Sequence, residues 1–252
     1  MIRAVLFDLD DTLLDLNLTA FLARYMTGAS KLLAEVGRMP TAKVMAAYAK
    51  AFLAVDADGR QDSLTNEQLF NQTFEAACGI PLDDPAIAEL IHYFEHDIVP
   101  TYDKGIVRAR PQEGGREAVN AVWNLGLVCA LATNPTFSLT CDKTRMAWAN
   151  VYEDDFALIS TWSNSTRVKP DARYYQEFVD MLGLQLDECL MVGNDTRRDF
   201  ARPSCGLRTA YVGHAHPSKA IWSGTMLELS RELPRIIDGL NASDSSAGKS
   251  TW

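Results

Sequence analysis

Two aspartates near the N-terminus offer the first candidate chemistry in the sequence. Asp8 and Asp10 stand two positions apart, directly after an apolar run at residues 2–7 that predicts a buried strand. At the exit of such a strand both carboxylates face the same crevice. Two close negative charges raise the pKa of one carboxyl unless a cation or a shared proton compensates. The pair therefore predicts a metal site or an acid/base couple, and the alternative is that the two carboxylates cap the next segment.

More oxygen ligands follow a later apolar run. Residues 189–192 lead into Asn194 and Asp195, and Asp199 comes four positions after Asp195. Hard oxygen donors from a few side chains, with room for water and a phosphate, suit Mg²⁺ better than zinc. This stretch therefore favours a magnesium site if it lies beside the first pair of aspartates.

Two further segments could bind an anionic oxygen. Thr133 and Asn134 end an apolar run and precede a helical pattern, so a hydroxyl and free backbone N–H groups become available there. Lys169 precedes another helical pattern, and Pro170 holds the backbone before it extended. Taken alone, such a lysine is usually a solvated surface charge.

Alternating strand and helix patterns must position these residues. This alternation predicts an α/β fold with a Rossmann-like, doubly wound parallel sheet, in which ligands bind at the carboxyl ends of the strands. The unusual polar residues fall at those ends. We predict strands at residues 2–7, 127–132, 157–160, 189–192 and 209–212, and helices at residues 113–124, 136–149 and 171–182.

A long helical stretch interrupts this alternation after the first strand. Residues 15–108 show helical spacing without a convincing strand, which predicts an inserted all-helical cap domain over the strand ends. The core domain is then made of residues 1–14 and 109–240. Residues 241–252 lack apolar periodicity and are predicted to form a flexible C-terminal tail.

Composition excludes several classes of function. The 252 residues carry a formal net charge of −9, which argues against a nucleic-acid partner because phosphates would be repelled. No apolar run reaches bilayer length and no signal-peptide core is visible, so we expect a cytoplasmic protein without a membrane partner. Five scattered cysteines without a CxxC pair imply neither a disulfide framework nor a zinc site. The sequence leaves the oligomeric state open.

Four separated motifs together resemble the haloacid dehalogenase superfamily of aspartate-nucleophile hydrolases. The resemblance covers roughly residues 1–215, and the helical insertion is similar to the C1-type cap of that family. The ordered set is far more specific than any single motif. The motifs are Phe7-Asp8-Leu9-Asp10-Asp11-Thr12-Leu13, Ala132-Thr133-Asn134, Lys169-Pro170 and Val192-Gly193-Asn194-Asp195-Thr196-Arg197-Arg198-Asp199.

This resemblance implies a role for each matching residue. Asp8 would be the nucleophile that forms an aspartyl-phosphate, and Asp10 would protonate the leaving oxygen and then activate water. Thr133 and Asn134 would bind phosphoryl oxygens. Lys169 would hold the nucleophile and the phosphoryl group together, and would contact the substrate as well.

The resemblance also implies a bound Mg²⁺ ion. Asp8, the carbonyl of Asp10 and a carboxylate of the fourth motif would hold it. The commoner form of that motif has Asp directly after Gly, whereas Asn194 occupies that place here and Asp195 follows. We predict Asp195 as the direct ligand because a carboxylate holds Mg²⁺ more strongly than an amide, with Asn194 and Asp199 as alternates.

The predicted function is a Mg²⁺-dependent phosphatase acting on a small phosphorylated metabolite. Other chemistries of the superfamily are alternatives, namely those of a sugar phosphomutase, a dehalogenase or a phosphonatase. Dehalogenases and phosphonatases of the family lack an acid/base Asp at the position of Asp10, so its presence favours phosphate esters. A non-catalytic, phosphate-binding regulatory protein is the alternative from another class.

Overall fold

A five-stranded parallel sheet forms the centre of the protein. The computed structural model describes residues 1–247, with side chains described to residue 244. The strand order is β4-β1-β5-β6-β7, with every neighbouring pair parallel. The strands are β1 (Ala4–Phe7), β4 (Val128–Leu131), β5 (Cys189–Gly193), β6 (Arg208–Val212) and β7 (Trp222–Gly224).

The register of the sheet brings three strand ends to one edge. Phe7 of β1 is paired with Leu131 of β4 and with Val192 of β5. Residues that follow these three positions therefore leave the sheet together, at its carboxyl edge. The register thus confirms that the polar motifs after these strands meet in space.

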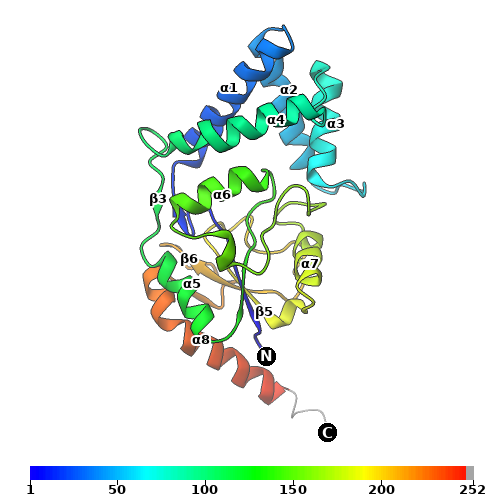
Figure 1. Ribbon diagram of the computed structural model, residues 1–252. Helices are drawn as coiled ribbons and strands as arrows, with labels where there is room; N and C mark the ends of the chain where they lie inside the picture. Colours follow the sequence, from blue (N-terminus) through cyan, green and yellow to red (C-terminus); the bar gives the residue numbers. More distant parts are fainter. Residues whose placement is uncertain (248–252) are drawn as a thin grey trace.

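Helices cover both faces of the sheet, as Figure 1 shows. Side chains of β1 alternate between two apolar clusters: Val5 and Phe7 belong to one, and Ala4 and Leu6 to the other. A strand buried on both faces is apolar throughout, which explains the uninterrupted run at the N-terminus. The helices of the core around this sheet are α5 (Gly115–Asn124), α6 (Leu139–Trp148), α7 (Ala172–Met181) and α8 (Met226–Ala247), with short turns η3 (Glu153–Asp155) and η4 (Leu186–Glu188).

Residues 18–102 are built of helices and are called the helical segment below. In Figure 1 its long helices lie beyond the end of the sheet, above α6. Two short strands, β2 (Leu14–Asp15) and β3 (Arg110–Pro111), pair antiparallel where the chain leaves and re-enters the core. The segment comprises α1 (Leu18–Val36), α2 (Thr41–Val55), α3 (Asn66–Cys78), α4 (Pro85–Tyr93), the π-helical turn η1 (Phe94–Ile98) and the 3₁₀ turn η2 (Val99–Tyr102).

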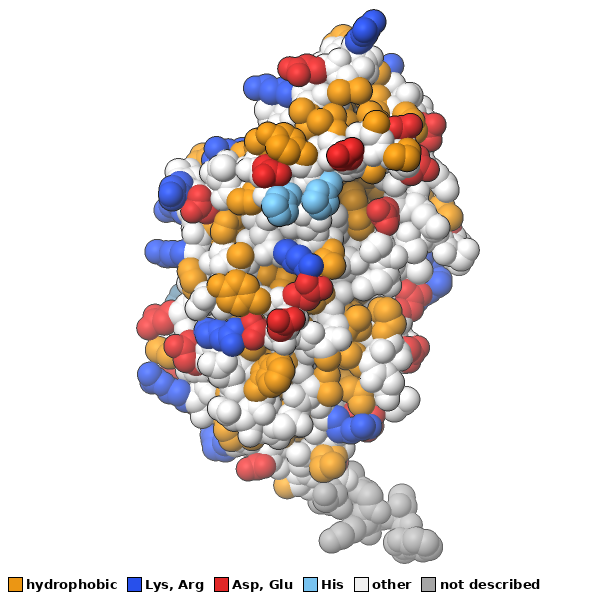
Figure 2. All heavy atoms as spheres, in the orientation of Figure 1, with side chains coloured by type: hydrophobic (Ala, Val, Ile, Leu, Met, Phe, Trp, Pro, Cys, Tyr) orange, Lys and Arg blue, Asp and Glu red, His pale blue; other side chains and the backbone are white. Residues whose placement is uncertain are grey.

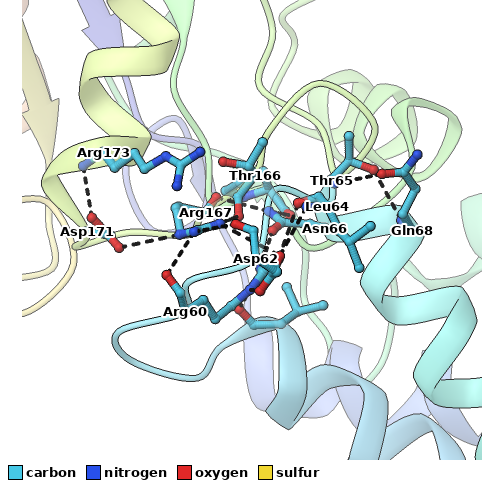
Figure 3. A network of polar contacts seen from close by, with 12 residues as sticks. Arg60, Asp62, Leu64, Thr65, Asn66, Gln68, Thr166, Arg167, Asp171 and Arg173 are labelled. Atoms are coloured by element: carbon cyan, nitrogen blue, oxygen red, sulfur yellow. Dashed lines mark hydrogen bonds and ion pairs between the residues drawn. The ribbon is translucent and has the colours of Figure 1, made fainter.

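Buried polar contacts fasten the helical segment to the core at a second place. Figure 3 shows Arg167 of the core pointing toward the loop between α2 and α3, where it donates to the carbonyls of Arg60 at 2.8 Å and Asp62 at 2.7 Å. Asn66, which is fully buried, donates to the carbonyls of Pro135 and Arg167, both at 3.0 Å. These contacts hold the end of α2 over the carboxyl edge of the sheet.

The edges of the sheet differ from the sequence prediction. Residues 157–160 do not form a strand, and only an isolated parallel bridge joins Ile159 to Leu131 of β4. The segment nevertheless runs beside β4, because the backbone N–H of Ala157 donates to the carbonyl of Cys129 at 2.8 Å and that of Leu131 to the carbonyl of Leu158 at 2.8 Å. The last strand, β7, was not predicted, because its polar and glycine residues carry no strand pattern.

Residues 241–247 of the predicted tail continue α8. Polar contacts hold this end of the helix to the core, and such contacts produce no periodic pattern of apolar residues in the sequence. The backbone N–H of Ile2 donates to Asn241 Oδ1 at 2.7 Å, and Asp244 pairs with Arg208 of β6 at 2.9 Å. Residues 248–252 of the predicted tail lie outside the described residues.

The surface carries interspersed charges. On the face drawn in Figure 2, basic and acidic side chains alternate over the core and the helical segment. Within residues 1–247, no helix is long and apolar enough to span a bilayer.

Candidate active site

A cavity of about 540 Å³ opens at the carboxyl edge of the sheet, beneath α1 and α2. Its size is typical of a site for a small ligand. Polar residues from strand ends and loops face apolar residues of the two helices. The lining includes Asp8, Asp10, Asp11, Asn134, Lys169, Asn194, Asp195 and Asp199 from the core, and Leu18, Leu22, Met26, Phe52, Leu53 and Asp56 from the helical segment.

Asp8 is held from both sides at the wall of this cavity. Its backbone N–H donates to the carbonyl of Val192 at 2.9 Å, which extends the pairing of β1 with β5 by one residue. Lys169 Nζ donates to Asp8 Oδ1 at 2.8 Å, and Thr12 Oγ1 lies 3.2 Å from Asp8 Oδ2. The residue is 8% exposed and lines the cavity, so its side chain keeps an open side.

Lys169 is a buried cation between two carboxylates. Only 1% of the residue is exposed, and Nζ donates to Asp199 Oδ1 at 2.7 Å as well as to Asp8. Burial alone would lower the pKa of Lys169, but the carboxylates of Asp199 and Asp8 raise it above its usual value. The ammonium group therefore stays charged at neutral pH, and the surface-charge interpretation of this lysine is excluded.

Asp199 packs against the end of β5 because residue 193 is glycine. A Cβ atom at Gly193 would lie 2.2 Å from Asp199 Oδ2, so no larger residue fits there without displacing the carboxylate. The same oxygen accepts the backbone N–H of Asp195 at 2.8 Å. Both oxygens of Asp199 thus have protein donors, which makes this residue an anchor for Lys169 and for the fourth motif.

Asn194 and Asp195 both line the cavity, but their side chains have different hydrogen-bond partners. Thr12 Oγ1 lies 3.2 Å from Asn194 Oδ1, so one hydroxyl stands between this amide oxygen and the carboxylate of Asp8. Asp195 Oδ1 accepts the backbone N–H groups of Arg197 at 2.7 Å and Arg198 at 3.3 Å, which caps the turn that follows. Asp195 Oδ2 has no such partner among the described residues. The sequence prediction gave Thr12 no role of its own, although it stands inside the first motif.

Asn134 lines the cavity, whereas Thr133 is not among the lining residues. Asn134 Oδ1 accepts the backbone N–H of Lys169 at 3.1 Å, which ties the second motif to the third. The carbonyl of Thr133 accepts hydrogen bonds from Ser160 Oγ at 2.7 Å and Tyr174 OH at 2.9 Å. These bonds fix the turn that presents Asn134 to the cavity. Thr133 itself is buried, with 1% of the residue exposed.

An arginine of α6 completes the site and was missed by the sequence prediction. Arg145 Nη1 donates to Asp10 Oδ2, and Nη2 donates to Asp142 Oδ1. Burial raises the pKa of Asp10, while the charge of Arg145 opposes the rise. Arg145 lies in the helix predicted at residues 136–149, and no signal in that helix distinguishes it from a surface arginine.

The oxygen donors fit a hard divalent cation if amide or backbone oxygens take part. Among the described residues, no three His, Cys, Asp or Glu side chains are grouped closely enough to hold a metal ion without other ligands. Asp8, Asp195 and Asn194 nevertheless present oxygens to one cavity, and no cysteine or histidine is among the described residues that line it. This donor chemistry is that of Mg²⁺ sites, which often use few carboxylates and keep several waters.

Comparison with known proteins agrees with this geometry. The family model described as "haloacid dehalogenase-like hydrolase" matches residues 2–200. The chain belongs to this family. The hydrolase family and the α/β fold predicted from the motifs are thereby confirmed.

The individual relatives share only a small part of their sequence with this chain. An N-acetylmuramic acid 6-phosphate phosphatase from Pseudomonas aeruginosa is 26% identical over 244 residues, 94% of this chain and 95% of the relative. The crystal structure of a HAD phosphatase from Thermococcus onnurineus has a TM-score of 0.56 at 17% identity, covering 92% of this chain and 98% of that one. CbbY from Rhodobacter sphaeroides, solved with phosphate, has a TM-score of 0.54 at 15% identity, covering 91% and 96%. These two structures support the fold alone.

Proposed function

We propose that this hydrolase is a phosphatase that transfers the phosphoryl group of a small phosphorylated metabolite to Asp8 and then to water. One observation carries the proposal. The Asp8 carboxylate stands at the wall of a ligand-sized cavity, with the buried ammonium group of Lys169 2.8 Å from one of its oxygens. This arrangement places a nucleophilic carboxylate next to a positive charge that also attracts phosphate.

The reaction has two displacement steps at phosphorus. In the first, a carboxylate oxygen of Asp8 forms a bond to phosphorus, the bond to the ester oxygen breaks, and Asp10 gives its proton to the departing alcohol. In the second, water attacks the aspartyl-phosphate, and Asp10 takes the proton that the water loses. The bond between phosphorus and Asp8 then breaks, and its electron pair restores the carboxylate. The sum is hydrolysis of the ester to an alcohol and inorganic phosphate.

Other core residues neutralise and orient the phosphoryl group. Lys169 offsets the repulsion between Asp8 and the incoming phosphate, since its charge lies between the carboxylates of the site. Asn134 lines the cavity, where its side-chain amide could donate to a phosphoryl oxygen, and the turn at Thr133 holds it in place. Thr133 acts in this proposal through its position in that turn.

Mg²⁺ is the metal that we propose for the site. Asp8, the carbonyl of Asp10, and Asp195 or Asn194 would hold it, and Asp199 would support them from behind through Lys169. When bound, such an ion supplies positive charge to the phosphoryl oxygens and to the nucleophile. Asp195 is the preferred ligand of the pair because Oδ2 is available and carries charge.

The helical segment would act as the cap domain of residues 15–108. Leu22 and Met26 of α1 and Phe52 of α2 form an apolar wall opposite the carboxylates, where the alcohol part of a substrate would lie. Arg198 beside the fourth motif pairs with Asp56 at the end of α2, at 2.8 Å and 3.1 Å. The relative named as an N-acetylmuramic acid 6-phosphate phosphatase favours a phosphosugar among small metabolites.

Hydrolysis of p-nitrophenyl phosphate tests the proposal. We expect turnover with Mg²⁺, loss with EDTA, and a loss of at least about 10³-fold in kcat for Asp8→Asn. Asp15→Asn is the matched control, because Asp15 lies on β2, pairs with Arg110 and does not line the cavity. A folded protein that binds phosphate without turnover would instead support the regulatory alternative. A panel of N-acetylmuramic acid 6-phosphate, N-acetylglucosamine 6-phosphate and glucose 6-phosphate, compared by kcat/KM, then tests the substrate class.

A further inference from the structure

Arg145 is a buried cation on the wall of the candidate active site that the reaction steps above do not use. It lies on α6, is 1% exposed and lines the cavity. Its guanidinium group pairs with Asp10 after β1 and with Asp142 one turn earlier on α6. The centre of the guanidinium stands 4.7 Å from the ring centroid of Phe137 and 5.9 Å from that of Phe21. Asp142, Phe137 and Phe21 therefore hold the guanidinium group in place where it meets Asp10.

The two oxygens of Asp10 have different surroundings. Arg145 Nη1 donates to Oδ2, whereas Oδ1 is buried and has no hydrogen-bond partner among the described residues. A carboxyl group with one oxygen held by a guanidinium cannot rotate freely. The contact with Arg145 therefore fixes the position and the plane of a carboxyl group that lines the cavity.

We propose that Arg145 is a positioning residue for proton transfer by Asp10, and that Asp142 and the ring of Phe137 hold Arg145 in place. This inference rests on the proposed function, in which Asp10 is the acid that protonates the leaving alcohol. Arg145 itself touches neither the substrate nor the reacting atoms. Its contribution is to fix where the carboxyl group of Asp10 stands and how it is oriented toward the cavity.

The network is poorly built for stability alone. Within the described part of the chain, Asp142 Oδ2 and Arg145 Nε are buried without hydrogen-bond partners, as Asp10 Oδ1 is. A buried ion pair adds little net stability even when its hydrogen bonds are complete, and incomplete ones make it worse. Proteins leave buried polar groups without hydrogen-bond partners chiefly at functional sites. Because the incomplete network lies against the cavity, a role in the site explains it better than a role in folding.

The inference predicts that replacing Arg145 lowers kcat/KM by an amount that depends on the leaving group of the substrate. An alkyl phosphate needs a proton on its departing oxygen, whereas p-nitrophenolate departs without one. The value of kcat/KM reports the steps up to the first irreversible one, which is phosphoryl transfer to Asp8. Misplacing the proton donor should therefore lower kcat/KM for an alkyl phosphate and leave that for p-nitrophenyl phosphate nearly unchanged.

Arg145→Lys is the main test, because lysine keeps the charge but lacks the planar fork that holds two carboxylates at once. With Mg²⁺, we expect kcat/KM for glucose 6-phosphate to fall about 10- to 100-fold, a fraction of the full effect of a general acid. The value for p-nitrophenyl phosphate should change by less than about threefold. Arg145→Met should give the same selectivity with a larger loss, and a thermal melt of each variant checks that it is folded.

The matched control is Arg116→Lys. Arg116 of α5 also pairs with an aspartate of the core, Asp155, at 2.5 Å, but neither residue lines the cavity. Both substrates should be hydrolysed by this variant at the rate of the unchanged protein. A similar selective loss in Arg116→Lys would show that the effect arises from general loosening of the core, and would overturn the inference.

Asp10→Asn separates failure of this inference from failure of the proposed function. If Asp10→Asn loses kcat/KM selectively for glucose 6-phosphate but Arg145→Lys does not, Asp10 is the acid and Arg145 does not position it. If Asp10→Asn affects both substrates equally, the assignment of Asp10 as the acid is itself wrong. A rise in KM with unchanged kcat in Arg145→Lys would mean that Arg145 binds substrate directly, which also contradicts the inference.

Discussion

Replacing Lys169 by methionine should destabilise the protein and abolish activity, since two buried carboxylates would lose their shared counter-charge. Nζ lies 2.8 Å from Asp8 Oδ1 and 2.7 Å from Asp199 Oδ1. At an effective dielectric constant of about 20, each contact is worth about 6 kcal/mol of Coulomb energy. Desolvation of the three charges offsets most of this, but removing one partner leaves the others uncompensated, which typically costs about 3–5 kcal/mol. We therefore expect the free energy of unfolding to fall by about 3–5 kcal/mol.

A double variant isolates the electrostatic part of that loss. In Lys169→Met with Asp199→Asn, one of the stranded carboxylates becomes neutral, so about 1–3 kcal/mol of the unfolding free energy should return. Asp199 suits this test because it is 1% exposed and cannot regain solvent easily. Urea unfolding in EDTA, followed by circular dichroism and tryptophan fluorescence together, measures both values. A cost below about 1 kcal/mol for Lys169→Met, or no recovery in the double variant, would refute the charge-balance reasoning.

Two smaller changes probe other parts of the structure. Gly193→Ala places a Cβ atom 2.2 Å from Asp199 Oδ2, so we expect a loss of about 1–3 kcal/mol in urea unfolding together with a large drop in turnover; unchanged turnover would contradict the packing argument. Glu95 of η1 is 2% exposed and accepts a hydrogen bond from Tyr25 OH at 2.6 Å, and burial raises the pKa of this carboxyl. Its charged form therefore destabilises the folded state increasingly as pH rises above the ordinary pKa of Glu, and the Tm of Glu95→Gln relative to the unchanged protein should increase from pH 5 to pH 8. A pH-independent difference in Tm would exclude this burial effect.

The sequence was sufficient for the parts of the site that follow strands. An apolar run that ends in Asp8 can be recognised locally, and parallel pairing brings the ends of β1, β4 and β5 to one edge whatever the details of packing. The cavity at that edge contains Asp8, Lys169 and Asp195, as the motifs predict. The local sequence pattern and the general geometry of parallel sheets are sufficient to predict this part of the site.

What the sequence could not provide depends on contacts between distant segments. Arg145 meets Asp10 across 135 positions, and its side chain looks like any other on a polar helix face. The distinction between Asn194 and Asp195 likewise depends on which backbone N–H groups each side chain accepts. The continuation of α8 depends on Arg208 reaching Asp244, which no helical periodicity encodes.

The charge balance of the cavity connects these observations to the chemistry. Six aspartates line it, together with three cationic side chains, those of Lys169, Arg145 and Arg198. Each of the three cations already contacts a carboxylate, so among the described residues lining the cavity none of their charges is left unpaired. Even with Asp10 protonated the lining stays net negative, and a phosphate dianion adds to the repulsion. Binding of the substrate together with a divalent cation relieves this repulsion, whereas phosphate alone would have to break an existing ion pair. The dependence on Mg²⁺ in our proposal is therefore a consequence of the charges that the protein itself places around Asp8.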